Sequence, residues 1–210
     1  MSGHIVLLGD SIFDNKSYTR GEPDVVAHLR AALPSGWRAT LLAVDGTTTT
    51  DVARQFDVIP KDATHVVLSL GGNDALLNSD LLSTPLRSSS EALLMFAARL
   101  EPFESAYRQT LTSLVSRGYD LTVCTIYDGA LEPDYARLAR VALMTFNDVI
   151  LRVAFELGVN VVDLRQVCVD SADYANPIEP SGTGGRKIAR AIARAVGAVP
   201  GAVVSRVSGG

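Results

Sequence analysis

The chain has 210 residues, of which 47% are hydrophobic and 20% are charged, and its formal net charge at pH 7 is −4. This composition is typical of an ordinary globular protein with a sizeable core. The acidic balance and the lack of a lysine or arginine run argue against nucleic acid as a partner. No run of about 18 apolar residues predicts a membrane span, and no signal-peptide pattern opens the chain, so we expect a cytoplasmic protein.

Short apolar runs alternate with helical patterns along the whole chain. The runs predict five strands, at residues 5–8, 38–44, 65–70, 121–126 and 159–164, of which the first is expected to be buried. Helix spacing predicts helices at 23–33, about 47–56, 101–117, about 134–157 and 184–196. Strands joined by helical crossovers form a mostly parallel sheet that is covered on both faces. We therefore expect an α/β fold in a single domain over residues 1–210, with a flexible tail from about residue 200.

Ser11 stands where the first predicted strand ends, at the carboxyl edge of the expected sheet. Two further loops, one containing Gly46 and one reading Gly-Gly-Asn-Asp at 71–74, also follow predicted strands. The carboxyl ends of parallel strands share one edge, so these loops should meet there. A serine hydroxyl, the N–H groups of Ser11 and Gly46 and the Asn73 amide then supply a nucleophile and three donors. That is the inventory for acyl transfer with a stabilised oxyanion.

These blocks resemble the SGNH (GDSL-type) hydrolase family. The resemblance rests on G-D-S-I-F-D-N at 9–15, Gly46, G-G-N-D at 71–74 and P-S-G-T-G-G-R-K-I-A at 180–189. It implies a three-layer α/β/α sandwich of the flavodoxin-like type. It also implies that Ser11 is the catalytic nucleophile, that Ser11 N–H, Gly46 and Asn73 form the oxyanion hole, and that the substrates are small esters or thioesters. No cofactor and no metal are expected, because no cluster of ligand residues has metal-site spacing.

The last block departs from the family pattern. The family usually has Asp-x-x-His directly before Pro-Ser, whereas this chain has Asn176 and Glu179 at those positions. The three histidines of the chain, His4, His28 and His65, lie far from this block. The first and last of them open strands at the edge opposite Ser11, so we expect structural roles for all three.

Two interpretations of this departure stay open. In the first, Glu179 is the general base, and the neutral Asn176 orients it without adding a second carboxylate. A carboxylate near pKa 4.3 is a weaker base than an imidazole near 6.5, and burial beside Ile178 would narrow that gap. In the second, the triad has decayed, and the protein is a pseudoenzyme that binds a ligand. We favour the serine hydrolase, because the nucleophile and all oxyanion donors are intact.

Further residues near the same edge are assigned lesser roles. Asp10 and Asp74 are expected to support the two loops that carry them. Ile12, Leu76 and Tyr127 are expected to contact the substrate. The leucine-rich stretch after the Gly-Gly-Asn-Asp block is expected either to wall an acyl pocket or form a lid, or to be ordinary core. Two more polar residues are assigned either to a turn cap or to substrate contact: Asp14 and Asn15.

Overall fold

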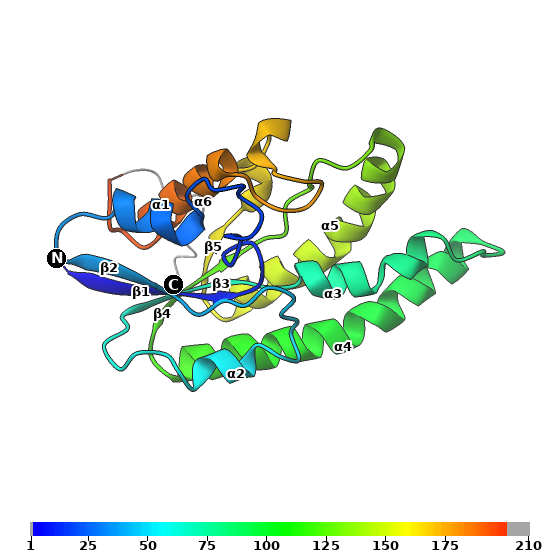
Figure 1. Ribbon diagram of the computed structural model, residues 1–210. Helices are drawn as coiled ribbons and strands as arrows, with labels where there is room; N and C mark the ends of the chain where they lie inside the picture. The colour runs from blue at the N-terminus through cyan, green and yellow to red at the C-terminus, as the bar shows by residue number, and fades with distance from the viewer. Residues whose placement is uncertain (1, 201–210) are drawn as a thin grey trace.

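A parallel sheet of five strands forms the centre of the computed structural model, which describes residues 2–200 (Figure 1). The strands lie in the order β2 (Trp37–Leu41), β1 (Gly3–Gly9), β3 (His65–Ser69), β4 (Asp120–Cys124) and β5 (Asn160–Val162). All four neighbouring pairs are parallel. The predicted five-stranded parallel α/β fold is therefore confirmed. The expected tail lies outside the described residues, except for residue 200.

Helices cover both faces of this sheet and make the expected three layers (Figure 1). One face carries α1 (Val25–Ala32) and α6 (Gly182–Ala195). The other carries α2 (Ala53–Phe56), α4 (Ser89–Ser116) and α5 (Pro133–Glu156). Shorter elements follow the strands: α3 (Gly72–Leu77) and the 3-10 turns η1 (Ser79–Leu82), η2 (Leu164–Gln166) and η3 (Ser171–Asp173). No helix within residues 2–200 is long and apolar enough to cross a bilayer.

Strand β1 explains why the first apolar run has no alternation. Ile5 and Leu7 pack toward α1 and α6, whereas Val6 and Leu8 pack toward α4 and α5. All four side chains are fully buried. Successive side chains of a strand point to opposite faces, so a strand covered on both faces is apolar throughout.

Helix α4 begins twelve residues before the position that the sequence predicted. Ser88 caps it by accepting a hydrogen bond from the Glu91 N–H at 3.2 Å, and the Glu91 carboxylate accepts one from the Arg87 N–H. The prediction of a start at residue 101 was wrong because the apolar spacing before it is irregular and includes three consecutive serines, at 88–90. Pro102 lies inside the helix. Packing of a long helix outweighs the one backbone hydrogen bond that an internal proline removes.

Helix α2 is shorter than predicted, because the threonines at 47–50 form turns instead of its first turns. The Thr47 hydroxyl donates to the Val44 carbonyl at 2.7 Å, and the Thr48 hydroxyl donates to the Asp51 carboxylate at 2.7 Å. Such local side-chain bonds compete with helix formation. Residues 47–52 are therefore free to form a loop at the carboxyl edge of the sheet. The amino-terminal halves of α4 and α5 extend beyond that same edge (Figure 1).

Candidate active site

Ser11 lies in a tight turn at the end of β1, residues 9–11, which we call the nucleophile turn. Gly9 has φ +115°, and a Cβ there would lie 1.7 Å from the Ser69 carbonyl oxygen, so only glycine fits. The side-chain amide of Gln55 binds both backbone groups of Gly9, each at 2.8 Å. The turn is therefore fixed directly on the central sheet. Sequence reasoning missed Gln55, since a lone glutamine in a short helix carries no signal.

Glu179 is hydrogen-bonded to Ser11 although 168 residues separate the two in the chain. The Ser11 hydroxyl donates to Glu179 Oε1 at 3.0 Å. Both residues are buried, with 8% and 6% of their surface exposed. Burial raises the pKa of the Glu179 carboxyl to about 7, with a further rise from the Asp45 charge and an opposing effect of the Ser11 hydrogen bond. Its second oxygen, Oε2, has no hydrogen-bond partner within residues 2–200.

Asn176 lies in the same loop as Glu179, residues 174–181, which we call the base loop. The Asn176 side-chain oxygen accepts hydrogen bonds from the N–H groups of Ile178 and Glu179, both at 2.9 Å. Asn176 therefore contacts the backbone of Glu179 and not its carboxylate. The amide folds the loop into a turn that carries Glu179 to Ser11.

Other parts of the chain hold the base loop through its backbone carbonyls. These hydrogen bonds are Asn15 Nδ2 to Pro180 at 3.1 Å, Tyr127 hydroxyl to Ile178 at 2.6 Å and Ala130 N–H to Pro177 at 2.8 Å. Asn15 is fully buried, and its oxygen also accepts from the N–H of Val25 at the start of α1. Asn15 therefore ties the segment after Ser11 to the base loop, which is neither of the roles considered from the sequence.

The loops that carry Gly46 and Asn73 are joined to each other. Asn73 Nδ2 donates one hydrogen to the Thr47 carbonyl at 3.0 Å, and its second hydrogen remains available. Gly46 is exposed and has φ +80°. Within residues 2–200, the N–H groups of Ser11 and Gly46 donate to no other group. The carboxyl edge therefore carries three donors without a full set of acceptors.

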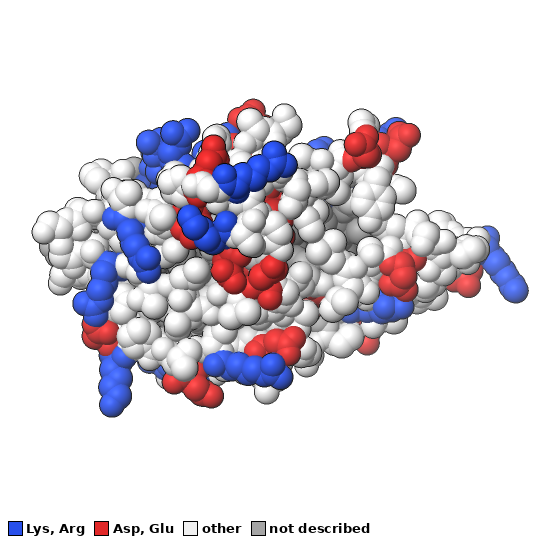
Figure 2. Space-filling view, in the orientation of Figure 1, with Lys and Arg blue, Asp and Glu red and all other residues white. Residues whose placement is uncertain are grey.

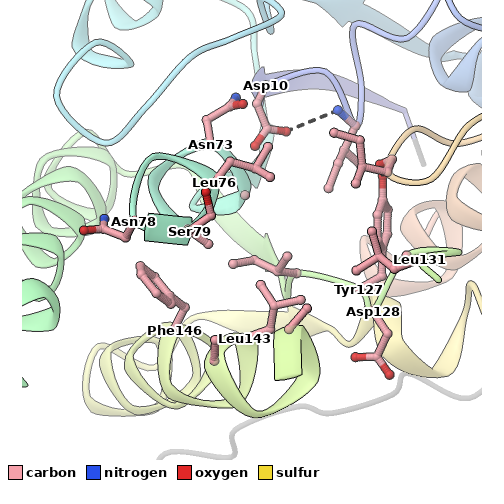
Figure 3. A pocket seen from close by; sticks show the side chains of 18 of the residues that line it. Asp10, Asn73, Leu76, Asn78, Ser79, Tyr127, Asp128, Leu131, Leu143 and Phe146 are labelled. Atoms are coloured by element: carbon pink, nitrogen blue, oxygen red, sulfur yellow. Dashed lines mark hydrogen bonds between the residues drawn. The ribbon is translucent and has the colours of Figure 1, made fainter. Parts of the chain in front are cut away.

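The two predicted supporting aspartates bind backbone groups near this edge. Asp10 Oδ1 accepts from the Ile12 N–H at 3.2 Å (Figure 3). Burial raises the pKa of Asp10 to about 7, and the charge of Glu179 adds to the rise. Asp74 accepts from the backbone N–H and the hydroxyl of Thr49, and burial raises its pKa also. Asp74 thus links α3 to the loop of Gly46.

Ser11 and Glu179 open on a cavity of about 120 Å³ (Figure 3). The three predicted substrate contacts, Ile12, Leu76 and Tyr127, all line this cavity. The hydroxyl of Tyr127 is already used in the base loop, so this side chain presents its ring. Gly46 is not part of the lining. The leucine-rich stretch contributes both to the cavity wall and to the core. Leu76 lines the cavity and is 48% exposed, whereas Leu81 is buried.

No histidine lines the cavity. His4 is buried at the opposite edge of the sheet, with its ring nitrogens 3.2 Å from Asp62 and 2.8 Å from Thr40. His65 packs against Trp37, with ring centroids 5.1 Å apart and the two ring planes tilted by 42°. His28 lies within α1, away from the cavity. Within residues 2–200, no group of three His, Cys, Asp or Glu side chains is placed to hold a metal ion.

Comparisons with known proteins agree with this architecture. The model of the GDSL-like lipase/acylhydrolase family matches residues 7–203. A search of curated proteins finds no significant match. Among solved structures, the chain is similar to an extracellular lipase from Streptomyces rimosus, with TM-score 0.67, 18% identity, and 92% of this chain and 100% of that chain covered.

Two acetyl xylan esterases also share the fold. One, AlAXEase, has TM-score 0.70 and 15% identity, with 92% of this chain and 99% of that chain covered. Another, from Geobacillus stearothermophilus, has TM-score 0.66 and 22% identity, with 93% and 94% covered. At these identities the similarity to solved structures establishes the fold alone.

Proposed function

The chain belongs to the GDSL-like lipase/acylhydrolase family and is an ester-hydrolysing enzyme, and from this premise we propose that it forms an acyl-enzyme on Ser11 with Glu179 as the general base. The substrates are carboxylic esters or thioesters. The observation that supports this proposal best is the 3.0 Å hydrogen bond from the Ser11 hydroxyl to Glu179 Oε1. A base must lie within such reach of the proton that it removes.

Glu179 is suited to this task by its surroundings. A carboxyl with an ordinary pKa is a weak base, but burial raises the pKa of Glu179 to about 7. A base is most effective when its pKa is near the working pH. Asn176 supports this role as a neutral residue, since a carboxylate beside Glu179 would disfavour its ionised form. The Asn176 contacts with the base-loop backbone hold Glu179 without adding charge.

The reaction then proceeds in two halves. Ser11 Oγ attacks the carbonyl carbon of the ester while its proton passes to Glu179, and the carbonyl oxygen becomes an oxyanion. The bond to the alcohol oxygen breaks, and the Glu179 proton passes to the leaving alcohol. Water next loses a proton to Glu179 and attacks the acyl carbon, and the acid leaves as Ser11 regains its proton. The same carboxyl group thus acts as base and acid in turn.

The oxyanion is stabilised by the donors that the fold leaves without acceptors. We assign this role to the N–H groups of Ser11 and Gly46 and to the second amide hydrogen of Asn73. Donors fixed before the reaction stabilise the developing charge without reorganisation, and each one typically contributes about a hundredfold or more in rate. Ile12, Leu76 and the ring of Tyr127 are assigned to substrate contact.

Hydrolysis of p-nitrophenyl butyrate tests this proposal. We expect Ser11→Ala to lower kcat/KM at least about a thousandfold and Glu179→Gln to lower it about a hundredfold or more. Glu101→Gln, an exposed change on α4, is the matched control and should keep the wild-type rate. Mass spectrometry of the quenched enzyme should detect an acyl group on Ser11.

The pH profile separates a base from a residue that merely shapes the site. Because Glu179 must be ionised, log kcat/KM of the wild type should rise with a slope of one up to about pH 7 and then level off. This acidic limb should vanish in Glu179→Gln. A Glu179→Gln variant with the wild-type rate and the same limb would remove Glu179 from the mechanism.

A further inference from the structure

One face of α5 forms a wall of the cavity beside Ser11. Tyr135, Ala139, Ala142, Leu143 and Phe146 all line the cavity. Their spacing of three and four residues places them on one side of the helix. The two alanines lie in the middle of this row, so the wall is recessed where larger side chains would fill the space.

The facing wall comes from α3, η1 and the residue between them, and it combines Leu76 with the polar residues Asn73, Asn78 and Ser79 (Figure 3). Its apolar part also contains Leu82, with Phe96 from α4 in the same lining. The outer surface over α3 and the middle of α5 carries few charged side chains (Figure 2). A ligand group between these walls would therefore lie mainly, though not entirely, against hydrocarbon.

The polar side chains at this end of the cavity are mostly engaged within the protein. Asn78 donates to the Asp74 carbonyl at 2.8 Å and accepts from Arg99 at 2.9 Å. Asp128 pairs with Arg140 at 3.0 Å. Two lining hydroxyls, those of Ser79 and Tyr135, have no partner among the described residues. This set is poor for a sugar, which presents many hydroxyls to be bound.

The acyl half and the alcohol half of an ester leave this site at different steps. The acyl half stays on Ser11 through the second step, whereas the alcohol half must leave to solvent. Gly46 is exposed and lies outside the cavity lining, as does its neighbour Asp45, which accepts from the Tyr18 hydroxyl. The side of Ser11 that carries Gly46 is therefore polar and open, which suits the leaving alcohol. The apolar cavity suits the half that remains.

We propose that the substrate carries a medium-length hydrocarbon acyl chain, of about eight carbons, which lies between α3 and α5. A volume of about 120 Å³ has room for about four water-sized groups, so the cavity encloses the first carbons of the chain and the rest lies along the partly exposed Leu76 and Tyr135. This inference rests on the proposed function of Ser11. Each methylene that leaves water favours binding about fourfold, so an acetyl ester gains almost nothing from the cavity while an octanoyl ester gains along its whole chain.

A chain-length series tests the inference with a filled cavity and a matched control. The substrates are the p-nitrophenyl esters of acetate, butyrate and octanoate, and the measured quantity is kcat/KM. We expect the wild type to prefer octanoate over acetate by at least about thirtyfold. Ala142→Phe should lower the octanoate value at least about tenfold more than it lowers the acetate value. Val141→Phe, on the exposed side of the same helix, should change neither.

Each other outcome has a defined meaning. Equal rates for acetate and octanoate in the wild type, or an unchanged preference in both Ala142→Phe and the smaller change Ala142→Leu, would overturn the acyl pocket. Faster hydrolysis of octyl acetate than of methyl octanoate would overturn it too, because the alcohol would then fill the cavity. Full activity of Ser11→Ala on every ester would instead overturn the proposed function. The urea unfolding curve of Ala142→Phe reports whether the variant is folded.

Discussion

The nucleophile turn and the base loop meet at one hydrogen bond but are held in different ways. The nucleophile turn continues a central strand and is fixed by the close fit of Gly9 and by Gln55. The base loop lies between η3 and α6, and it is held by side chains from distant parts of the chain, Asn15 and Tyr127. The nucleophile is thus positioned by the sheet itself, whereas the base is positioned by a few contacts that separate substitutions can remove.

Gly9→Ala should have the largest effect on stability, because the nucleophile turn is held too closely against β3 to make room for a side chain. The new Cβ would lie 1.7 Å from the Ser69 carbonyl, in a backbone conformation that disfavours side chains. We expect a loss of more than about 3 kcal/mol in the free energy of unfolding, measured with urea. Gly21→Ala has a similar φ of +93° with nothing within 4 Å, so it should cost only about 1 to 2 kcal/mol. Equal losses in the two variants would mean that the turn can move.

Glu179→Gln should stabilise the protein at high pH, because the wild type loses stability when its buried Glu179 carboxyl ionises. The pKa of Glu179 rises from an ordinary 4.5 to about 7 on folding, so the folded state holds the proton more tightly than the unfolded state. The wild type therefore loses stability as the pH rises from about 4.5 to 7, and glutamine avoids this loss.

The expected gain of Glu179→Gln is about 3 kcal/mol at pH 8 and near zero at pH 4, from urea unfolding at both values. The exposed change Glu101→Gln should show no such difference. If the Glu179→Gln variant is less stable than the wild type at pH 8, then ionisation of the buried Glu179 carboxyl does not destabilise the folded protein.

Asn15→Ala should have a smaller effect on stability and a specific effect on catalysis. It leaves the Val25 N–H and the Pro180 carbonyl without their buried partner, at a cost of about 2 kcal/mol. Because the base loop loses one support, kcat should fall more than KM changes. Asn160→Ala removes an exposed contact with Asp120 and should cost less than about 0.5 kcal/mol. Unchanged kcat in Asn15→Ala would show that the other contacts suffice.

Local sequence predicted the strands and the position of Ser11, for a physical reason. Mostly apolar runs of four to seven residues bounded by glycine or polar turns are typical of strands in a sheet that is covered on both faces. Once the strands are parallel, every loop that follows one lies at the same edge. The meeting of Ser11 with the loops of Gly46 and Asn73 therefore follows from topology alone, without any knowledge of side-chain packing.

Contacts between distant segments could not be predicted in the same way. The sequence marked Glu179 by its register in the last block, but its distance from Ser11 depends on how the base loop folds on Asn15 and Tyr127. The start of α4 was missed because the pattern before residue 101 is irregular, and tertiary packing decides where the helix begins. The single domain, the lack of nucleic-acid partners and the cytoplasmic location stay predictions.

Helix α5 serves two purposes along its length. Its carboxyl-terminal half packs on the sheet through Val149, Ile150 and Val153, which are almost fully buried, whereas Ala139 and Ala142 face the cavity. Substitutions in the first group should lower stability, while enlarging Ala142, which is only partly buried, should mainly reduce the space offered to a ligand. Selection can therefore change the substrate range of this enzyme at one end of α5, while the other end of the helix keeps the fold constant.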